Sequence, residues 1–135
     1  MIGLIVVAHG SLARSLLEAT EHVVGPLTNA HAVAIEPSDD LHARQAEINR
    51  LVIEANSGEG VVLVTDMFGG TPSNLAFGAI SGPEIEVICG ANLPLLVKLA
   101  KTRDRPLEQA VQAALDAGHK YIDAASRILD PARER

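Results

Sequence analysis

Two polar residues that could carry out chemistry each come at the end of an apolar run. His9 follows the run Ile2–Ala8, and Asp66 closely follows the run Val61–Val64. Such near-continuous apolar runs are typical of strands buried on both faces of a parallel sheet. Because ligands bind outside the carboxyl ends of such strands, the sequence predicts that His9, Asp66 and a third residue, Asn92, lie at one edge.

His9 and Asp66 are residue types that could form a nucleophile and the acid that orients it. A neutral imidazole has one nitrogen with a free lone pair and one that carries a proton, so a nucleophilic histidine needs a partner for its N–H. The Asp66 carboxylate could accept that N–H and stabilise the positive charge that develops on the ring during attack. A lone histidine after a strand more often makes structural hydrogen bonds. The second strand ends in an acid, however, and this favours a chemical role for His9.

A glycine-rich turn after Asp66 leads into an expected helix. Gly69 and Gly70 allow backbone angles that other residues avoid. Thr71 is expected to cap the helix, and Pro72 suits its first turn. Unpaired N–H groups at a helix start attract phosphate, although the same pattern in isolation could be only an efficient turn.

Small and hydroxyl-bearing residues follow both strands and would contact the oxygens of a phosphoryl group. The candidate phosphate-binding residues are Gly10, Ser11, Gly70, Thr71 and Ser73. Asn92 is a candidate supporting residue, but it could also merely cap its own helix. These loops contain no arginine, and loosely held phosphate suits reversible transfer better than hydrolysis.

Strand-like and helix-like stretches alternate along the chain, which predicts one α/β domain over residues 1–135. The alternation implies a doubly wound, four-stranded, mainly parallel sheet with helices on both faces and right-handed crossovers. The expected strands are residues 2–8, 30–35, 61–66 and 85–89. The expected helices are residues 12–24, 41–56, 71–80, 94–101 and 106–118, and Ser11 is expected to cap the first of them.

Two details of this fold depend on short patterns. The spacing of four apolar residues in the first helix predicts that their stripe faces the core. These residues are Leu12, Leu16, Ala19 and Val23. The tail Lys120–Leu129 is ambiguous, because Tyr121 and Ile122 favour a strand whereas Ala124–Arg127 favours a helix. We expect a short last strand at the edge of the sheet.

Composition limits the partners and the compartment. The net charge of −6 argues against nucleic acid and anionic membrane surfaces as main partners, and suits a basic protein surface. No apolar stretch reaches the roughly 18 residues that span a bilayer, and the start of the chain lacks a basic signal segment. We therefore expect a cytoplasmic protein.

The remaining histidines and the single cysteine suggest no further chemistry. Cys89 lies in an apolar run and is expected to be an inert core residue. The other histidines show no ligand spacing, so we expect neither a metal site nor a cofactor. These histidines are His22, His31, His42 and His119.

Three segments together resemble a known family, the mannose-type enzyme IIA component of the bacterial phosphoenolpyruvate-dependent sugar phosphotransferase system. They are Ile5–Gly10, Leu63–Asn74 and Gly90–Pro94. The resemblance covers nearly the whole chain. It implies that His9 accepts a phosphoryl group on Nε2 from the phosphocarrier protein HPr and passes it to a IIB component, while Asp66 holds Nδ1.

The same resemblance implies an assembly. It implies an antiparallel last strand, a homodimer in which that strand is exchanged between subunits, and peripheral association with a membrane permease. No IIB domain or linker follows within the 135 residues, so we expect the acceptor to be a separate IIB chain or a regulatory target.

Three other classes of protein share some of these sequence features. A sirohydrochlorin-type metal chelatase also begins with a strand ending in His-Gly-Ser, but it needs a second histidine late in the sheet, where this chain has Cys89–Asn92. A response-regulator receiver needs an acidic magnesium cluster where this chain has His9 and Gly10. A non-enzymatic module that binds a phosphorylated protein or a small anion stays open.

Overall fold

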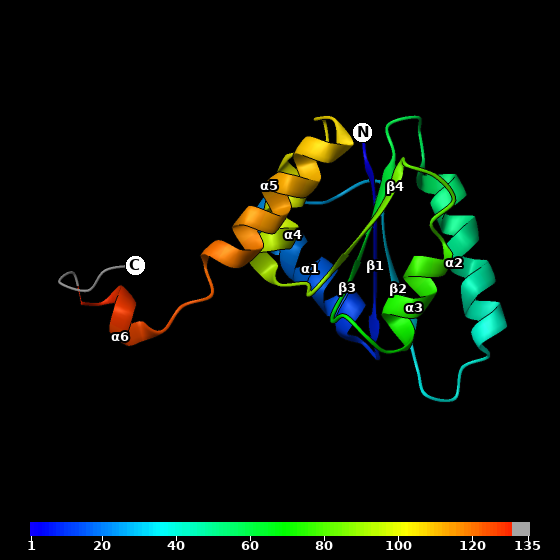
Figure 1. Cartoon of the computed structure of the whole chain (residues 1–135), viewed down its shortest axis with the longest axis horizontal. Coiled ribbons are helices and arrows are strands. Elements are labelled where there is room, and N and C mark those ends of the chain that lie inside the picture. Colours follow the sequence, from blue (N-terminus) through cyan, green and yellow to red (C-terminus); the bar gives the residue numbers. More distant parts are fainter. Residues whose placement is uncertain (131–135) are drawn as a thin grey trace.

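The computed structural model describes residues 1–130 and is built around a four-stranded sheet in the order β2-β1-β3-β4 (Figure 1). All three neighbouring strand pairs are parallel, which confirms the predicted α/β fold. The strands are β1 (Gly3–His9), β2 (Ala30–Ile35), β3 (Val61–Thr65) and β4 (Ile85–Cys89). The chain reverses its direction of travel across the sheet between β1 and β3, so these central strands form the switch point.

The central strands are apolar on both faces because helices cover both faces. Along β1, alternate residues enter two separate cores: Leu4 and Val6 enter one, and Ile5 and Val7 enter the other. All five residues of β3 are buried in the same way. This continuous burial explains why both strands are runs of Val, Leu and Ile rather than alternating polar and apolar residues.

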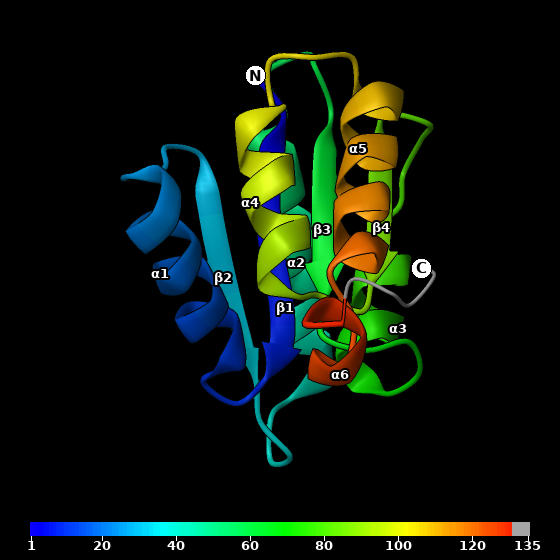
Figure 2. The ribbon, with the colours of Figure 1, turned by 90° about the vertical axis from the view of Figure 1, so that its left-hand side faces the viewer.

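Helices α1 (Leu12–Val24), α4 (Leu93–Lys101) and α5 (Leu107–Lys120) cover one face (Figure 2). Helices α2 (Leu41–Ala55) and α3 (Thr71–Gly78) cover the other face. Within residues 1–130, no helix combines the length and the apolar character that crossing a membrane would require.

The predicted inward stripe of α1 is wrong in its phase. The buried residues are Ala13, Leu17 and Thr20, whereas Leu12 and Val23 are exposed. Leu16 is only partly buried, at the edge of the core. The two stripes have the same helical spacing, so the period of the pattern could not choose between them. A small residue at position 13 lets the helix backbone lie close to the sheet.

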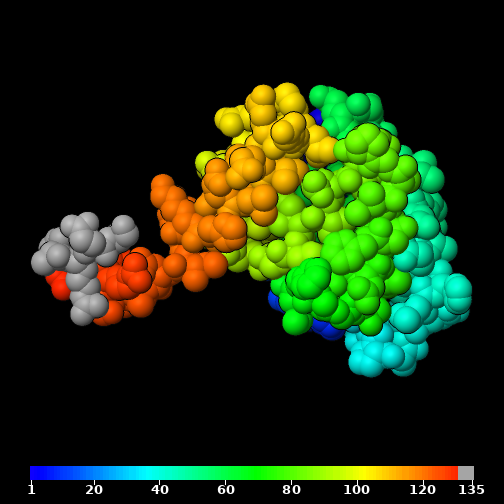
Figure 3. Space-filling view, viewed as in Figure 1, coloured from blue at the N-terminus to red at the C-terminus, as the bar shows by residue number. Residues whose placement is uncertain are grey.

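The predicted last strand is also wrong. After α5 the described chain has no strand; it forms a short helix, α6 (Ala125–Ile128). Its turn is closed by Ile128 N–H, which donates to Ala124 O, and by an Arg127–Asp123 ion pair one helical turn apart. The helix-favouring run therefore outweighs the two strand-favouring residues before it. The segment projects away from the body (Figures 1 and 3).

Candidate functional site

The switch point between β1 and β3 brings the predicted pair together. His9 is the last residue of β1, and Asp66 directly follows β3. Val7 pairs with Thr65 in the parallel register, so the two chain ends leave the sheet side by side. The structure therefore places His9 and Asp66 at one edge, as the sequence predicted.

Asp66 makes two hydrogen bonds to His9 through a single oxygen. Its Oδ2 lies 2.7 Å from His9 Nδ1 and accepts the backbone N–H of His9 at 3.1 Å. A carboxylate can only accept, so the imidazole proton belongs on Nδ1 and Nε2 carries the free lone pair. The His9 side chain is 53% exposed while that of Asp66 is only 11% exposed, so the acid lies beneath an open ring.

Burial and hydrogen bonding act in opposite directions on the Asp66 carboxyl. Burial raises the pKa of Asp66, but hydrogen bonds from the ring and backbone of His9 lower it, with a further lowering from the charge of the His9 ring. The net pKa lies below the ordinary value of 3.8. Asp66 is therefore an anion at neutral pH and can stabilise positive charge on the His9 ring.

The turn after Asp66 brings backbone next to the free nitrogen of His9. Gly70 has φ of 106°, a conformation that strongly favours glycine. A Cβ added to Gly70 would lie 3.9 Å from His9 Nε2. The main chain at Gly70 is therefore a wall of the space that a group on Nε2 would occupy.

The start of α3 differs in detail from the prediction. Gly70, not Thr71, occupies the N-cap position, and Thr71 is the first helical residue. No side chain caps the helix, and its first intrahelical bond runs from Asn74 N–H to Gly70 O. Amides in the first turn of a helix have no partner within it, so Thr71 and Ser73 offer free N–H groups. Pro72, between them, has none to offer.

The remaining candidates differ in their exposure. Ser11 is exposed at the start of α1, but its hydroxyl makes no capping bond. Ser73 is fully buried, and its hydroxyl donates to Gly70 O at 3.1 Å, which braces the turn. Asn92 accepts from Leu95 N–H at 3.0 Å and donates to Gly118 O at 2.9 Å. Asn92 therefore caps α4 and ties it to α5, as the alternative interpretation had it.

His9 opens into a cleft of about 430 Å³, and the opposite wall of this cleft was not predicted from the sequence. That wall comes from the segment after β2, because His9 pairs with Ile35 in the sheet register. The sequence feature that marks this wall is the polar stretch Pro37–Asp40. It lies beside His9 because β2 is a neighbour of β1 in the sheet, and the local sequence does not show this pairing. The cleft is lined by His9, Gly10, Ile35, Glu36, Pro37, Asp39, Leu41 and Thr71.

A second unpredicted feature is an apolar ridge next to Asp66, formed by Met67, Phe68 and Phe77. All three side chains are exposed, and Phe68 is 75% exposed. The rings of Phe68 and Phe77 lie 6.2 Å apart. These are the only two phenylalanines in the chain. Both Phe rings therefore lie on the surface beside the site, and none lies in the core.

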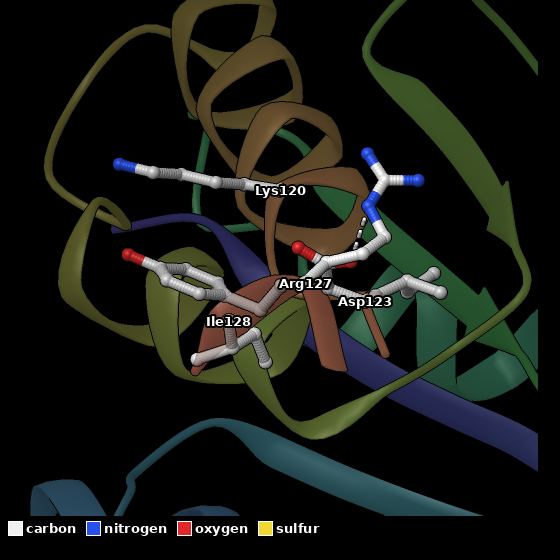
Figure 4. A pocket seen from close by; sticks show the side chains of 6 residues that line it. Lys120, Asp123, Arg127 and Ile128 are labelled. Atoms are coloured by element: carbon white, nitrogen blue, oxygen red, sulfur yellow. Dashed lines mark ion pairs between the residues drawn. The ribbon is translucent and has the colours of Figure 1, made fainter. Parts of the chain in front are cut away.

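A larger space of about 550 Å³ lies at the tail, between the end of α5 and α6 (Figure 4). Its lining includes Tyr121, Ile122 and the Arg127–Asp123 pair, but no histidine. Among residues 1–130, no three His, Cys, Asp or Glu side chains gather closely enough to hold a metal ion. We place the candidate site at His9 because a candidate nucleophile, an acid and free amides meet there.

Comparison with known proteins gives the family. The model of the EIIA-man family, described as "PTS system fructose IIA component", matches residues 3–116. The mannose-specific EIIAB component of the phosphotransferase system (PTS) of Escherichia coli K12 is 27% identical over 126 residues. That match covers 91% of this chain and 39% of the relative, so the chain spans about two fifths of the relative's length.

With shorter relatives, the alignment covers most of both proteins. The sorbose-specific EIIA component of Lacticaseibacillus casei is 29% identical over 98 residues, which are 72% of this chain and 70% of that protein. The solved structure of the mannose/sorbose-specific IIA subunit from Enterococcus faecalis is 27% identical, with a TM-score of 0.81. The alignment covers 91% of this chain and 93% of that one. The chain belongs to the mannose-type EIIA family of components of the sugar phosphotransferase system.

Proposed function

We propose that this protein is a phosphocarrier: Nε2 of His9 accepts a phosphoryl group from phosphorylated HPr and passes it to a IIB component or to a regulatory target. The observation that carries the proposal is the 2.7 Å bond between Asp66 Oδ2 and His9 Nδ1. It fixes the tautomer that leaves Nε2 nucleophilic, and the open ring is accessible to a second protein.

The transfer exchanges one P–N bond for another. The Nε2 lone pair of His9 attacks the phosphorus, and the donor imidazole leaves with the electron pair of the broken P–N bond. Positive charge develops on the His9 ring, and the ionised Asp66 stabilises it through Nδ1–H. The proton stays on Nδ1, and the reverse sequence delivers the phosphoryl group to the next acceptor. No cofactor takes part in this scheme.

Backbone amides would receive the phosphoryl oxygens. The candidates are the N–H groups of Ser11, Gly70, Thr71 and Ser73, with the hydroxyls of Ser11 and Thr71. The N–H of Gly10, the remaining candidate from the sequence, already donates to Ile35 O at 2.9 Å, so Gly10 would only line the space for the phosphoryl group. The hydroxyl of Ser73 is buried and already donates to Gly70 O, so we assign it to the turn instead. Amides hold a phosphoryl group more loosely than a fork of arginines would, and this favours reversible transfer.

The surface around His9 suits a protein partner. The apolar ridge lies on one side of the site, and the acidic wall with Glu36 and Asp39 lies on the other. Exposed aromatic rings are frequent anchors in protein interfaces, and acidic side chains attract a basic partner. Both features fit the docking of HPr and then of IIB.

We also propose that the protein is a homodimer. The projecting tail carries exposed apolar side chains: Tyr121, Ile122, Ile128 and Leu129. In a single copy these side chains contact mostly water, which is unfavourable unless another chain covers them. Light scattering should give the mass of two chains for the wild type and of one chain for Ile122→Asp. A monomeric wild type would contradict the assembly.

The decisive experiment is phosphorylation in a purified system. The protein is incubated with phosphoenolpyruvate, enzyme I and HPr, and the phosphate on the chain is then measured. We expect an acid-labile, base-stable phosphate, as a phosphohistidine gives, with no label when HPr is omitted. Amide NMR shifts on phosphorylation should concentrate near His9, Asp66 and Thr71. A chain that stays unlabelled with active HPr would refute the proposal and leave a non-enzymatic binding module.

A further inference from the structure

A free carboxylate stands next to the phosphoryl acceptor. Gly10 N–H donates to Ile35 O at 2.9 Å, which ties the residue after His9 to the end of β2. Glu36 follows directly, and its Oε1 lies 4.0 Å from where a Cβ on Gly10 would be. Glu36 and His9 line the same cleft.

The backbone of Glu36 is fixed, although its side chain is not paired. Asp39 Oδ2 accepts the N–H of Glu36 at 2.9 Å, and Asp39 N–H donates to Glu36 O at 3.1 Å. These two bonds close a tight turn that keeps Glu36 at the cleft. Its own carboxylate has no hydrogen bond or ion pair with any residue in the described range 1–130.

The cleft contains no cation that would balance this charge. Its lining includes Glu36 and Asp39 but no lysine or arginine. A phosphoryl group on Nε2 would bring close to two further negative charges into this space at neutral pH. Like charges in a shared cleft repel each other, and the repulsion is greatest at low ionic strength.

We propose that Glu36 raises the phosphoryl-transfer potential of the site by destabilising phosphorylated His9. This inference rests on the proposed function and concerns how that function is tuned. Asp66 and Glu36 then have opposite roles: Asp66 contacts the ring and stabilises its positive charge, while Glu36 lines the cleft into which His9 opens and repels a phosphoryl group there. The P–N bond at Nε2 breaks more readily, and the phosphoryl group is passed on rather than retained.

The test compares two glutamate-to-glutamine variants, each of which removes one negative charge without changing the size of the side chain. Glu36→Gln removes the charge in the cleft. Glu108→Gln is the control, because Glu108 is exposed in the first turn of α5. That turn lies at the opposite end of the sheet, where Leu107 packs near Gly60 just before β3.

Two quantities are measured at low salt: the equilibrium between phosphorylated HPr and the phosphorylated protein, and the rate at which the isolated phosphoprotein releases inorganic phosphate. In release, water oxygen forms a bond to phosphorus, the P–N bond breaks, and Nε2 keeps the electron pair. For Glu36→Gln we expect the equilibrium to shift about two- to fivefold towards the phosphoprotein, with slower release. The shift should shrink as salt is added, and Glu108→Gln should match wild type.

The outcomes separate this inference from the proposed function. A wild-type chain that takes up no phosphate overturns both. A wild type that is phosphorylated while Glu36→Gln shows the same equilibrium, or a shift that does not respond to salt, overturns the role of Glu36 and leaves the phosphocarrier proposal intact. Circular dichroism on both variants checks that the fold is retained.

Discussion

His9 and Asp66 lie 57 residues apart in the chain, yet a single oxygen of Asp66 contacts both the ring and the backbone N–H of His9. The backbone contact holds the carboxylate in place whatever the ring does, and the ring contact then fixes the tautomer. In the proposed transfer, this arrangement prepares Nε2 for attack before a partner arrives. Preorganisation of this kind lowers the cost of reaching the transition state.

His9→Ala should abolish phosphorylation and leave the fold unchanged. The ring is 53% exposed and contributes little to the core, so we expect the unfolding midpoint to change only slightly. His22→Ala is the control, because His22 is exposed on α1. Label on His9→Ala together with an unlabelled His22→Ala would place the acceptor elsewhere.

Asp66→Asn should slow phosphorylation without abolishing it. The amide oxygen can still accept Nδ1–H, but the charge that stabilises the imidazolium is lost. We expect a rate about 10- to 100-fold lower in single-turnover transfer from phosphorylated HPr, because the hydrogen bond that orients the ring is kept while the charge is lost. A rate equal to that of wild type would remove Asp66 from the mechanism.

The stability of the fold should depend on pH through Asp66. Its pKa in the folded protein lies below the ordinary value of 3.8, so the ionised carboxylate stabilises the fold above that pH. This contribution is lost as the pH falls below 3.8 and through the folded value. The difference in unfolding free energy between wild type and Asp66→Asn should therefore be full at pH 5–7 and decline below about pH 4. Urea titrations at several pH values measure it, with the exposed Asp104→Asn as control. A constant difference would contradict the assignment.

The central strands and the pair at their ends could be predicted from sequence because one physical demand determines both. A strand buried on both faces must be a continuous apolar run, and it can carry a polar residue only where it leaves the sheet. The runs before His9 and Asp66 satisfy this demand. The capping of α3 was less predictable, since Gly70 and Thr71 are both acceptable N-caps and differ by one position.

Features that depend on which strands are neighbours could not be predicted. Glu36 and Asp39 reach the His9 cleft because β2 pairs with β1, and nothing in the local pattern around Pro37 records that pairing. The prediction of a strand in the tail was wrong for a different reason. A strand gains most of its stability from its neighbours, so two strand-favouring residues, Tyr121 and Ile122, carry little information unless a partner edge is known.

Gly70→Ala should reduce both stability and transfer. Gly70 has φ 106° and ψ 176°, a conformation that costs other residues about 1–3 kcal/mol. The added methyl group would also lie 3.9 Å from Nε2 and narrow the approach to it. Gly25→Ala is a close control, because Gly25 has φ 93° and ψ 174° at the end of α1, with no atom within 4 Å of an added Cβ. Both variants should lose similar stability in urea, and only Gly70→Ala should transfer more slowly. Equal transfer rates would show that Gly70 has no role beyond the turn.

Phe68→Ala should weaken the docking of the phosphoryl donor while leaving the chemistry intact. Phe68 is 75% exposed, so its removal should change the unfolding free energy by less than about 0.5 kcal/mol. If the ring is an interface anchor, its loss should cost about 1–2 kcal/mol of binding, which is about a five- to thirtyfold rise in KM for phosphorylated HPr at similar kcat. Ile53→Ala on α2 is the control, because Ile53 is 76% exposed in a helix that presents no part of the ridge. Steady-state phosphorylation over a range of HPr concentrations separates KM from kcat. An unchanged KM, or a fall in kcat alone, would mean that HPr docks without the ridge.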